Sequence, residues 1–324
     1  MKKMMTYSEG IREGMSAAMR KDPDVVLFGE DVGMFGGCFG VSAGMFDEFG
    51  PERVRDTPIS ESAIIGCAVG AASTGLRPIA EIMMMDFLTV AMDQMCNNAA
   101  KLRFMTGGAL HFPMVIRTAG GAGVNAAAQH SQSLEAWVTH VPGLKMVFPS
   151  NAQDAYGLML SAVADDNPVV YEEHKAMLAM ESEVDLDEGP IPLGVGKVVR
   201  PGSDVTIVAV GNMVHQALAA AETLEKDGID CEIIDPRTLY PFDFDMVANS
   251  IDKTHKAIVV SEEVKRGGYM GEISAQISEN LFDSLDAPVV RIGALNTPVP
   301  FSPGLEPIYL PNAEDIVKAA RSQG

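Results

Sequence analysis

The sequence predicts an α/β protein in which a domain with a mainly parallel sheet and helices on both faces precedes a smaller α/β domain. Short apolar runs of strand length alternate with segments of helical periodicity along most of the chain. Such alternation is typical of parallel sheets covered by helices. With 324 residues the chain exceeds the size at which a single core stops growing, so two domains are expected.

The first domain is expected at residues 1–180. Residues 6–20 predict a helix, because apolar side chains recur at helical spacing and Thr6 with Glu9 three residues later makes a capping box. Short apolar runs predict strands, and longer segments with apolar residues at helical spacing predict helices. The expected strands are 24–29, 77–85, 113–117, 144–148 and 169–171, and the further helices are 63–72, 88–105 and 151–164.

The second domain is expected at residues 202–324. Residues 181–201, before it, are rich in acids, prolines and glycines, which predicts a linker. Arg237, Glu262 and Glu263 lie at strand ends, where α/β sheets present ligands or partners. The expected strands are 204–210, 230–234, 257–261 and 288–292, and the expected helices are 213–226, 244–251, 271–285 and 313–321.

Charge and cysteine usage restrict the partners and the compartment. The formal net charge of −20 argues against nucleic acid and anionic membranes as partners, since both require a basic surface. A basic protein partner would fit this charge. The four cysteines show no C-x-x-C spacing, which predicts reduced thiols in a cytoplasmic protein. No apolar run follows the first lysines as in a signal peptide, and none reaches the roughly 18 residues of a membrane span.

Two short motifs match catalytic or binding patterns without the required context. Residues 40–44 fit the G-x-S-x-G motif of hydrolase nucleophiles, but that motif needs a strand directly before it, and the preceding residues are glycine-rich. Residues 121–126 fit the G-x-G-x-x-A dinucleotide fingerprint, but no acid follows at about 20 residues to hold a ribose. We therefore predict neither a serine nucleophile nor nicotinamide binding.

Residues 56–75 place one carboxylate, Glu61, at the start of an apolar helix of small residues. Ser60 is the expected N-cap of this helix. The run from 63 to 72 offers almost no polar group with which to pair an acid. Glu61 either faces a cavity or offsets the positive end of the helix dipole, and the local pattern leaves both interpretations open.

Five segments, taken in chain order, resemble the beta subunit of the thiamine-diphosphate-dependent first component of acetoin and 2-oxo acid dehydrogenase complexes. They are DTPISE at Glu61, RPIAEIMMMDF ending at Phe87, NAAKLRFMTGG, AAQHSQ at His130, and HVPGLKMVFPS. The likeness covers essentially the whole chain. It implies a transketolase-like pyrimidine-binding domain followed by a transketolase C-terminal domain, in agreement with the two α/β domains expected from the pattern.

The resemblance implies roles for four residues. Glu61 would bind the ring nitrogen of the cofactor's aminopyrimidine, favouring the tautomer that removes the thiazolium proton. Phe87 would stack on the pyrimidine, and Ile59 would also contact the cofactor. A lone histidine is most often structural, but His130 matches the family's histidine near the reacting carbon. This match implies proton transfer or steering of the lipoyl group.

The resemblance also implies a potassium ion held by backbone carbonyls. Hard cations prefer such oxygen ligands. The matching positions are Met114, Ala162, Asp165 and Asn167.

One part of a complete thiamine site is absent from the sequence. Such a site needs a GDG-type segment to hold magnesium and the diphosphate, and the chain contains no GDG. The resemblance implies that a separate alpha subunit supplies it, in an α2β2 assembly. The helix in residues 56–75 is then expected at a subunit interface, and the acidic surface would dock the basic binding domain of the lipoyl acyltransferase core.

The leading hypothesis is a catalytic beta subunit that cleaves acetoin or a 2-oxo acid and passes the acyl group to lipoamide. Segments such as ISESA and GAGVNAAAQHSQ resemble the acetoin-type members of the family most, and this resemblance favours acetoin over pyruvate or a branched-chain 2-oxo acid. A non-catalytic scaffolding subunit is the alternative of another class, although Glu61, Phe87 and His130 are all in place. A transketolase fragment would require a fused phosphate-binding domain, which we do not expect before the first helix.

Overall fold

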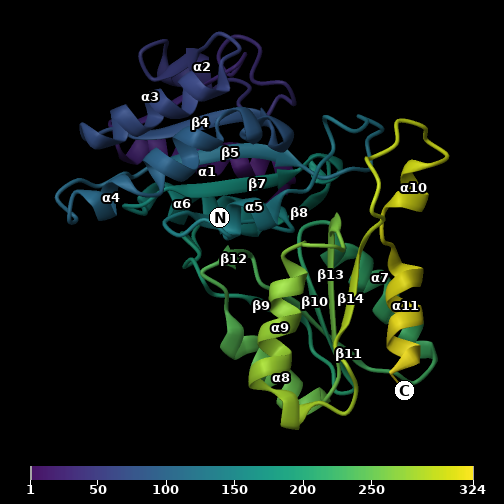
Figure 1. The fold of residues 1–324 in the computed structure, drawn as a ribbon. Coiled ribbons are helices and arrows are strands. Elements are labelled where there is room, and N and C mark those ends of the chain that lie inside the picture. The colour runs from purple at the N-terminus through teal and green to yellow at the C-terminus, as the bar shows by residue number, and fades with distance from the viewer. Residues whose placement is uncertain (1, 324) are drawn as a thin grey trace. The chain divides into compact units, whose positions relative to one another are not determined.

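The computed structural model describes residues 2–323, which form two compact α/β units (Figure 1). The first unit contains the residues up to Gly120 together with Trp137–Leu193. The second contains Gly121–Ala136 and the chain from Gly194 onward. The predicted fold class is confirmed. The units are not contiguous in sequence, however, because the segment Gly121–Ala136 groups with the second unit.

The first unit is built on a parallel sheet with the strand order β6-β7-β5-β4-β2-β3. Every strand expected from an apolar run in this part of the chain is present. The structure adds β3, an edge strand that pairs through its backbone and therefore needs no apolar pattern. The strands are β2 (Val25–Gly29), β3 (Val54–Asp56), β4 (Arg77–Met84), β5 (Val115–Gly120), β6 (Lys145–Val147) and β7 (Val169–His174).

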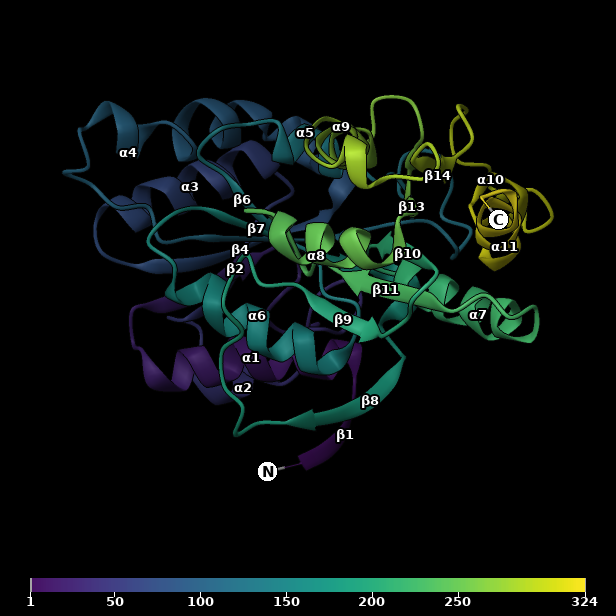
Figure 2. The same cartoon turned by 90° about the horizontal axis from the view of Figure 1, so that it is seen from below.

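Helices cover both faces of this sheet, with α1 (Tyr7–Lys21) and α6 (Ala152–Ala164) on one face and α3 (Glu61–Ser73) on the other (Figure 2). The predicted capping box at the start of α1 is present. Gly10 permits close packing of α1 on α6, because a Cβ there would lie 2.5 Å from a backbone oxygen of α6. The short helices are α2 (Met45–Phe49), α5 (Glu135–Thr139) and the single turn η3 (Lys175–Met177).

The prediction of one continuous helix over residues 88–105 is wrong. The chain forms a 3₁₀ segment η1 (Met85–Val90), a π-helical segment η2 (Gln94–Ala99) and a short helix α4 (Leu102–Met105). The Asp93 carboxylate accepts a hydrogen bond from the Asn97 side chain at 2.7 Å, and further amide side chains interact along η2. Side chains of this kind compete with regular helical pairing.

The predicted linker, residues 181–201, contains two strands. One of them, β8 (Glu181–Asp185), pairs antiparallel with β1 (Lys2–Thr6) in a two-stranded sheet of the first unit. Only Val184 of β8 is fully buried. The acids of this strand face solvent, so its composition resembled that of a linker.

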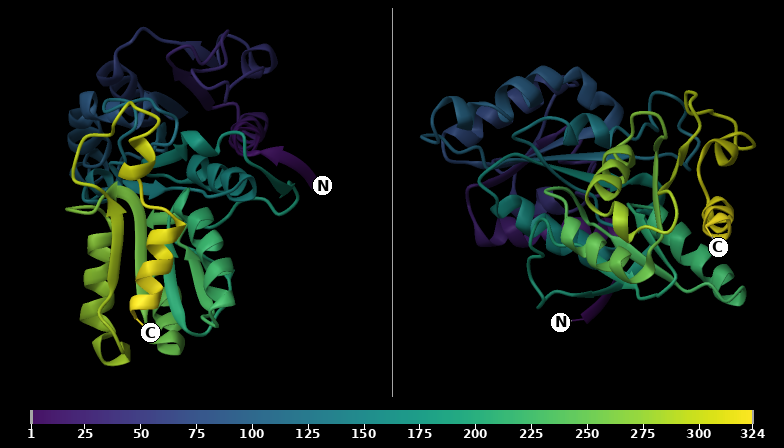
Figure 3. Two further views of the ribbon diagram at one scale, coloured as in Figure 1. Left: turned by 90° about the vertical axis from the view of Figure 1, so that its right-hand side faces the viewer. Right: turned by 60° about the horizontal axis from the view of Figure 1, so that its bottom comes forward.

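The second unit contains a five-stranded sheet in the order β14-β13-β10-β11-β9. The helices α7 (Met213–Lys226) and α11 (Ala313–Ser322) cover one face, and α8 (Phe244–Thr254) and α9 (Met270–Asn280) cover the other (Figures 1 and 3). The remaining elements are β9 (Lys197–Arg200), β10 (Val205–Ala209), β11 (Cys231–Asp235), β12 (Thr238–Tyr240), β13 (Ala257–Val264), η4 (Phe282–Ser284), β14 (Val290–Ala294) and α10 (Glu306–Tyr309).

Two expectations from composition can be compared with these elements. All four cysteines are free, in agreement with the expected reduced thiols. Across residues 2–323, no helix combines the length and the apolar character that crossing a bilayer requires.

A buried arginine links the central strands of the first unit. Arg117 on β5 is 1% exposed and forms ion pairs with Glu81 on β4 and Glu173 on β7. Burial raises the pKa of Glu173, while Arg117 opposes that shift. The guanidinium therefore compensates two carboxylates that the core could not otherwise hold in ionised form.

We expect Arg117→Met to destabilise the chain by about 3–5 kcal/mol, because two buried carboxylates would lose their counter-charge. Denaturant unfolding of the full chain measures this loss. Arg55→Met is the matched control, since the Arg55 ion pair with Glu52 is exposed and should contribute little. Equal stability of the two variants would contradict the role assigned to Arg117.

Candidate active site

Glu61 is the first residue of α3 and is only 8% exposed. Ser60 is the N-cap of this helix, as predicted, although its hydroxyl makes no capping hydrogen bond. Its ψ of 78° departs from the extended geometry in which such caps form. The Glu61 carboxylate therefore lies at the positive end of a helix whose following residues are almost all apolar.

A second acid, Glu30, interacts electrostatically with Glu61. Glu30 directly follows β2 and is buried. The backbone N–H of Thr57 donates to the Gly29 carbonyl at 2.9 Å, which ties the segment entering α3 to the end of β2. Burial raises the pKa of Glu30, and the negative charges of Glu61 and Asp31 add to this increase. The sequence pattern did not single out Glu30, although its position directly after a parallel strand is a signal that could have found it.

Phe87 and Ile59 lie in the same unit as Glu61. Phe87 is half-buried on η1, which follows β4 and contacts α3. Ile59 lies two residues before Glu61 and is 82% exposed. The first unit thus carries a nearly buried carboxyl group, a half-buried aromatic ring and an exposed aliphatic side chain on α3, η1 and the segment that leads into α3.

His130 belongs to the segment that groups with the second unit. It is half-buried, and its backbone N–H donates to the Ala127 carbonyl at 3.3 Å. Asn125 and Ala127 both have positive φ, 55° and 65°, a conformation that costs an alanine roughly 1 kcal/mol or more. The segment around His130 therefore stores backbone strain.

The structure agrees with the interpretation of both short motifs as chance matches. Ser42 is fully buried and its hydroxyl donates to the Val32 carbonyl at 2.8 Å, so it is not presented to a substrate. Residues 121–126 follow β5 but do not open a helix, whereas the dinucleotide fingerprint requires a helix N-terminus for the pyrophosphate.

The four positions implied for potassium lie on adjoining segments of the first unit. The Met114 carbonyl accepts from the Val169 N–H at 2.9 Å, and the Asp165 carbonyl accepts from Arg77 at 3.4 Å. The pKa of Asp165 is lowered, because hydrogen bonds from Lys145 and Asn167 outweigh its burial. A potassium ion here would share oxygens that already accept hydrogen bonds, and it would lie among cationic side chains.

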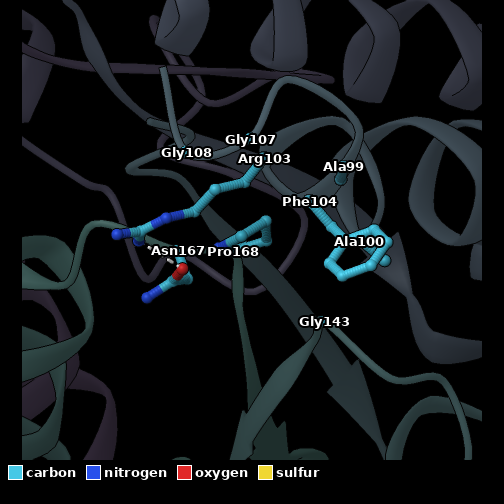
Figure 4. A pocket seen from close by; sticks show the side chains of 9 residues that line it. All are labelled: Ala99, Ala100, Arg103, Phe104, Gly107, Gly108, Gly143, Asn167 and Pro168. Carbon is cyan, nitrogen blue, oxygen red and sulfur yellow. Dashed lines mark hydrogen bonds between the residues drawn. The ribbon is translucent and has the colours of Figure 1, made fainter. Parts of the chain in front are cut away.

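A cavity of about 450 Å³ opens beside this region (Figure 4). Arg103 Nη1 donates to the Asn167 side-chain oxygen at 2.5 Å on one side of it, and Phe104, which is strongly exposed, lies on the other. The lining contains Asn167 but none of the residues implied for the thiamine cofactor. The cavity is therefore not the candidate active site.

Comparisons with known proteins agree with this architecture. The family described as "Transketolase, pyrimidine binding domain" matches residues 3–180, and "Transketolase, C-terminal domain" matches residues 194–316. A solved structure described as "Split gene transketolase, inactive beta4 tetramer" shares the fold, with a TM-score of 0.80, 23% identity and 98% coverage of both chains.

Three curated relatives match along nearly their whole length. The chain is 47% identical to "Acetoin:2,6-dichlorophenolindophenol oxidoreductase subunit beta" of Bacillus subtilis, covering 98% of this chain and 96% of the relative. It is 42% identical to "2-oxoisovalerate dehydrogenase subunit beta" of the same species, covering 98% of each. It is also 42% identical to "Pyruvate dehydrogenase E1 component subunit beta" of Rickettsia felis, covering 98% of this chain and 97% of the relative.

We expect Glu61→Gln to lower the pKa of Glu30, because the substitution removes a neighbouring negative charge. The pKa of Glu30 should return only partly to its ordinary value, because burial is the larger cause of its increase. Carboxyl-carbon NMR titration of the full chain with labelled glutamate measures it. Glu183→Gln, at an exposed acid on β8, is the control and should leave Glu30 unchanged. A pKa of Glu30 that is the same in all three proteins would refute the coupling.

Proposed function

We propose a function from one premise: this chain belongs to the transketolase-like family of beta subunits of acetoin and 2-oxo acid dehydrogenases. Our proposal is that the chain is the catalytic beta subunit of a thiamine-diphosphate-dependent component. With its alpha subunit it cleaves acetoin, or a 2-oxo acid, and transfers the acyl group to lipoamide. The observation that carries the proposal is Glu61, a nearly buried carboxyl group at the start of the apolar helix α3.

The residues of the first unit fit the pyrimidine end of this cofactor. Thiamine diphosphate, when bound, supplies the nucleophilic carbon that cleaves the bond next to a substrate carbonyl. Glu61 would hold a proton at the ring nitrogen of the aminopyrimidine, a task that suits a carboxyl group withdrawn from water. Phe87 would offer its ring to the pyrimidine face, and Ile59 would pack against the cofactor. Ile59 is 82% exposed and is therefore accessible to a ligand.

The same residues do not fit the diphosphate end. Glu30, Asp31 and Glu61 form a group of interacting acids, which would repel a phosphate. The chain also has no GDG segment. We therefore assign the diphosphate and its magnesium ion to the alpha subunit, so that each chain holds one end of the cofactor.

His130 is assigned to the acyl-transfer half of the reaction. An imidazole can give or accept a proton at the reacting carbon, and its size also allows it to orient a lipoyl arm. The strained backbone at Asn125 and Ala127 supports a functional role, since strain persists where a particular geometry is required.

Acetoin is the substrate that we favour. The acetoin-type relative is 47% identical to this chain, against 42% for the 2-oxoisovalerate and pyruvate relatives. Substrates that differ by a small group are distinguished by few pocket contacts, so this difference in identity favours acetoin and leaves pyruvate as the alternative.

The helix α3 is our proposed contact with the alpha subunit, in an α2β2 assembly. Its exposed face consists of small residues, among them Ala63, Cys67 and Gly70, and carries no charge. Small residues allow close approach of a second backbone, and an uncharged exposed helix face is more typical of an interface than of a solvated surface. The net charge of −20 supports docking of the complex on a basic domain of the acyltransferase core.

We expect the chain reconstituted with its alpha subunit to turn over acetoin with a higher kcat/KM than pyruvate, with lipoamide as acceptor. Glu61→Gln should lower kcat by roughly 100-fold or more, because the amide cannot exchange a proton with the pyrimidine nitrogen. Steady-state kinetics of the assembled complex measure both. Glu183→Gln is again the matched control, since this acid is exposed on β8.

The possible outcomes separate the alternatives. A large preference for pyruvate would replace the acetoin assignment while keeping the catalytic role. Unchanged activity of Glu61→Gln would instead support the scaffolding alternative. Tight cofactor binding and turnover by the chain alone would contradict the assignment of the diphosphate to an alpha subunit.

We expect Gly70→Leu to block assembly while the chain itself folds normally. A Cβ at Gly70 would meet no described atom within 4 Å, so the isolated chain has room for the side chain. At a close helix contact the same side chain should weaken association with the alpha subunit roughly tenfold or more. Analytical ultracentrifugation and thermal unfolding measure the two effects.

Ala219→Leu is the control for this experiment, because Ala219 is an exposed small residue on a helix of the second unit, α7. It should leave assembly unchanged. Normal assembly of Gly70→Leu would exclude this face of α3 from the interface.

A further inference from the structure

Three buried acids of the second unit hold the segment that carries His130. Each accepts a hydrogen bond from a different backbone N–H of the segment Gly121–Ala136. The pairs are Glu262 with Ala122 at 3.3 Å, Glu306 with Asn125 at 2.9 Å, and Glu263 with Ala136 at 2.8 Å. Glu262 and Glu263 hold the two ends of the segment, and Glu306 holds Asn125 between them.

These acids are themselves fixed by the second unit. Glu262 and Glu263 lie near the end of β13, where Glu262 also accepts from the Asn212 side chain at 3.0 Å and Glu263 from the Tyr269 N–H at 2.5 Å. Glu306 begins α10. One turn further along, Tyr309 packs in a small apolar cluster that also contains Ala122 of the segment. The acids that hold the segment therefore belong to β13 and α10, which are themselves held in place by hydrogen bonds and packing within the second unit.

Glu306 is the most deeply buried of the three acids. It is 2% exposed, and its second carboxylate oxygen has no hydrogen-bond partner among residues 2–323. Its bond to Asn125 spans 181 positions in the sequence. Burial of an acid with an unpaired oxygen costs free energy. Such a group is kept where the hydrogen bond that it makes is needed.

The N–H that Glu306 holds belongs to a strained residue. Asn125 has a φ of 55°, and Ala127 two positions later has a φ of 65°. Such conformations persist only where surrounding contacts determine them. A hydrogen bond to a carboxylate is stronger than one to a neutral acceptor, so Glu306 is suited to hold this turn five residues before His130.

We propose that Glu306 is a positioning residue for His130, which fixes the strained turn at Asn125 and thereby the place of the imidazole, while Glu262 and Glu263 fix the ends of the segment. The inference rests on the proposed function of His130. Glu306 lies far from His130 in the sequence, in the C-terminal part of the chain, and would act on the imidazole through the backbone.

Hydrogen–deuterium exchange on the full chain assembled with its alpha subunit tests the attachment. Glu306→Ala should raise the exchange rate at Asn125 and its neighbours roughly tenfold or more, because the N–H loses a buried acceptor. Glu306→Gln should largely restore protection, since the amide oxygen still accepts. Unchanged exchange in Glu306→Ala would overturn the proposal.

Glu232→Ala is the matched control for exchange. Glu232 is also a buried acid of the second unit, and it also accepts a backbone N–H, that of Gly202 at 3.3 Å, but this residue lies outside the segment. Loss of the Glu232 side chain should destabilise the second unit without a selective increase in the exchange rates of residues 121–136. Equal exchange effects of Glu232→Ala and Glu306→Ala in the segment would reduce Glu306 to a general structural role.

A double-mutant cycle tests whether Glu306 acts through His130. In acyl transfer to lipoamide, Glu306→Ala should lower kcat roughly tenfold with His130 present and have little effect in a His130→Ala background. Glu306→Gln should recover most of the rate. Effects that multiply would overturn the positioning role. If His130→Ala alone left the rate unchanged, the proposed function of His130 would fail, while the exchange experiment would still decide whether Glu306 holds the segment.

Discussion

The ion triad of Arg117 with Glu81 and Glu173 is the interaction on which the first unit depends. It joins β4, β5 and β7, the strands whose carboxyl ends lead into the loops of the unit. Ion pairs of this kind add little net stability over an apolar core, but removal of one partner is costly because the other charges stay buried. The triad therefore acts mainly as a constraint on strand register, and α3 and η1 are placed by the sheet that it holds together.

Carboxyl groups recur near the proposed functional positions of both units, with different environments. At α3 the acids lie near one another, and burial together with like charges raises the pKa of Glu30. Such an arrangement suits a site that handles protons and excludes anions. A cofactor with a diphosphate group would then need a second protein surface with the opposite character, which is a physical reason for dividing such a site between two subunits.

In the second unit, buried acids accept hydrogen bonds from backbone N–H groups. Burial raises the pKa of Glu263 to about 7, although hydrogen bonds from Ala136, Tyr269 and Glu135 favour its charged form. Because its pKa in the folded chain exceeds the ordinary value, the stability that depends on the protonated form is complete at acid pH and decreases as the pH rises toward 7. The acids that hold the segment of His130 are thus groups whose burial costs free energy.

Sequence alone determined the strands with apolar runs, the capping box of α1, the two α/β units and the position of Glu61 at a helix start. These features follow from local periodicity and local hydrogen bonding, which a linear pattern records. Tertiary structure alone decided that β3 and β8 form strands, that residues 88–105 break into three segments, and that Glu30 interacts with Glu61. It also assigned the segment of His130 to the second unit. These features depend on contacts between residues far apart in the chain, which leave no periodic pattern in the sequence. The hydrogen bond from Asn125 to Glu306, for example, spans 181 positions.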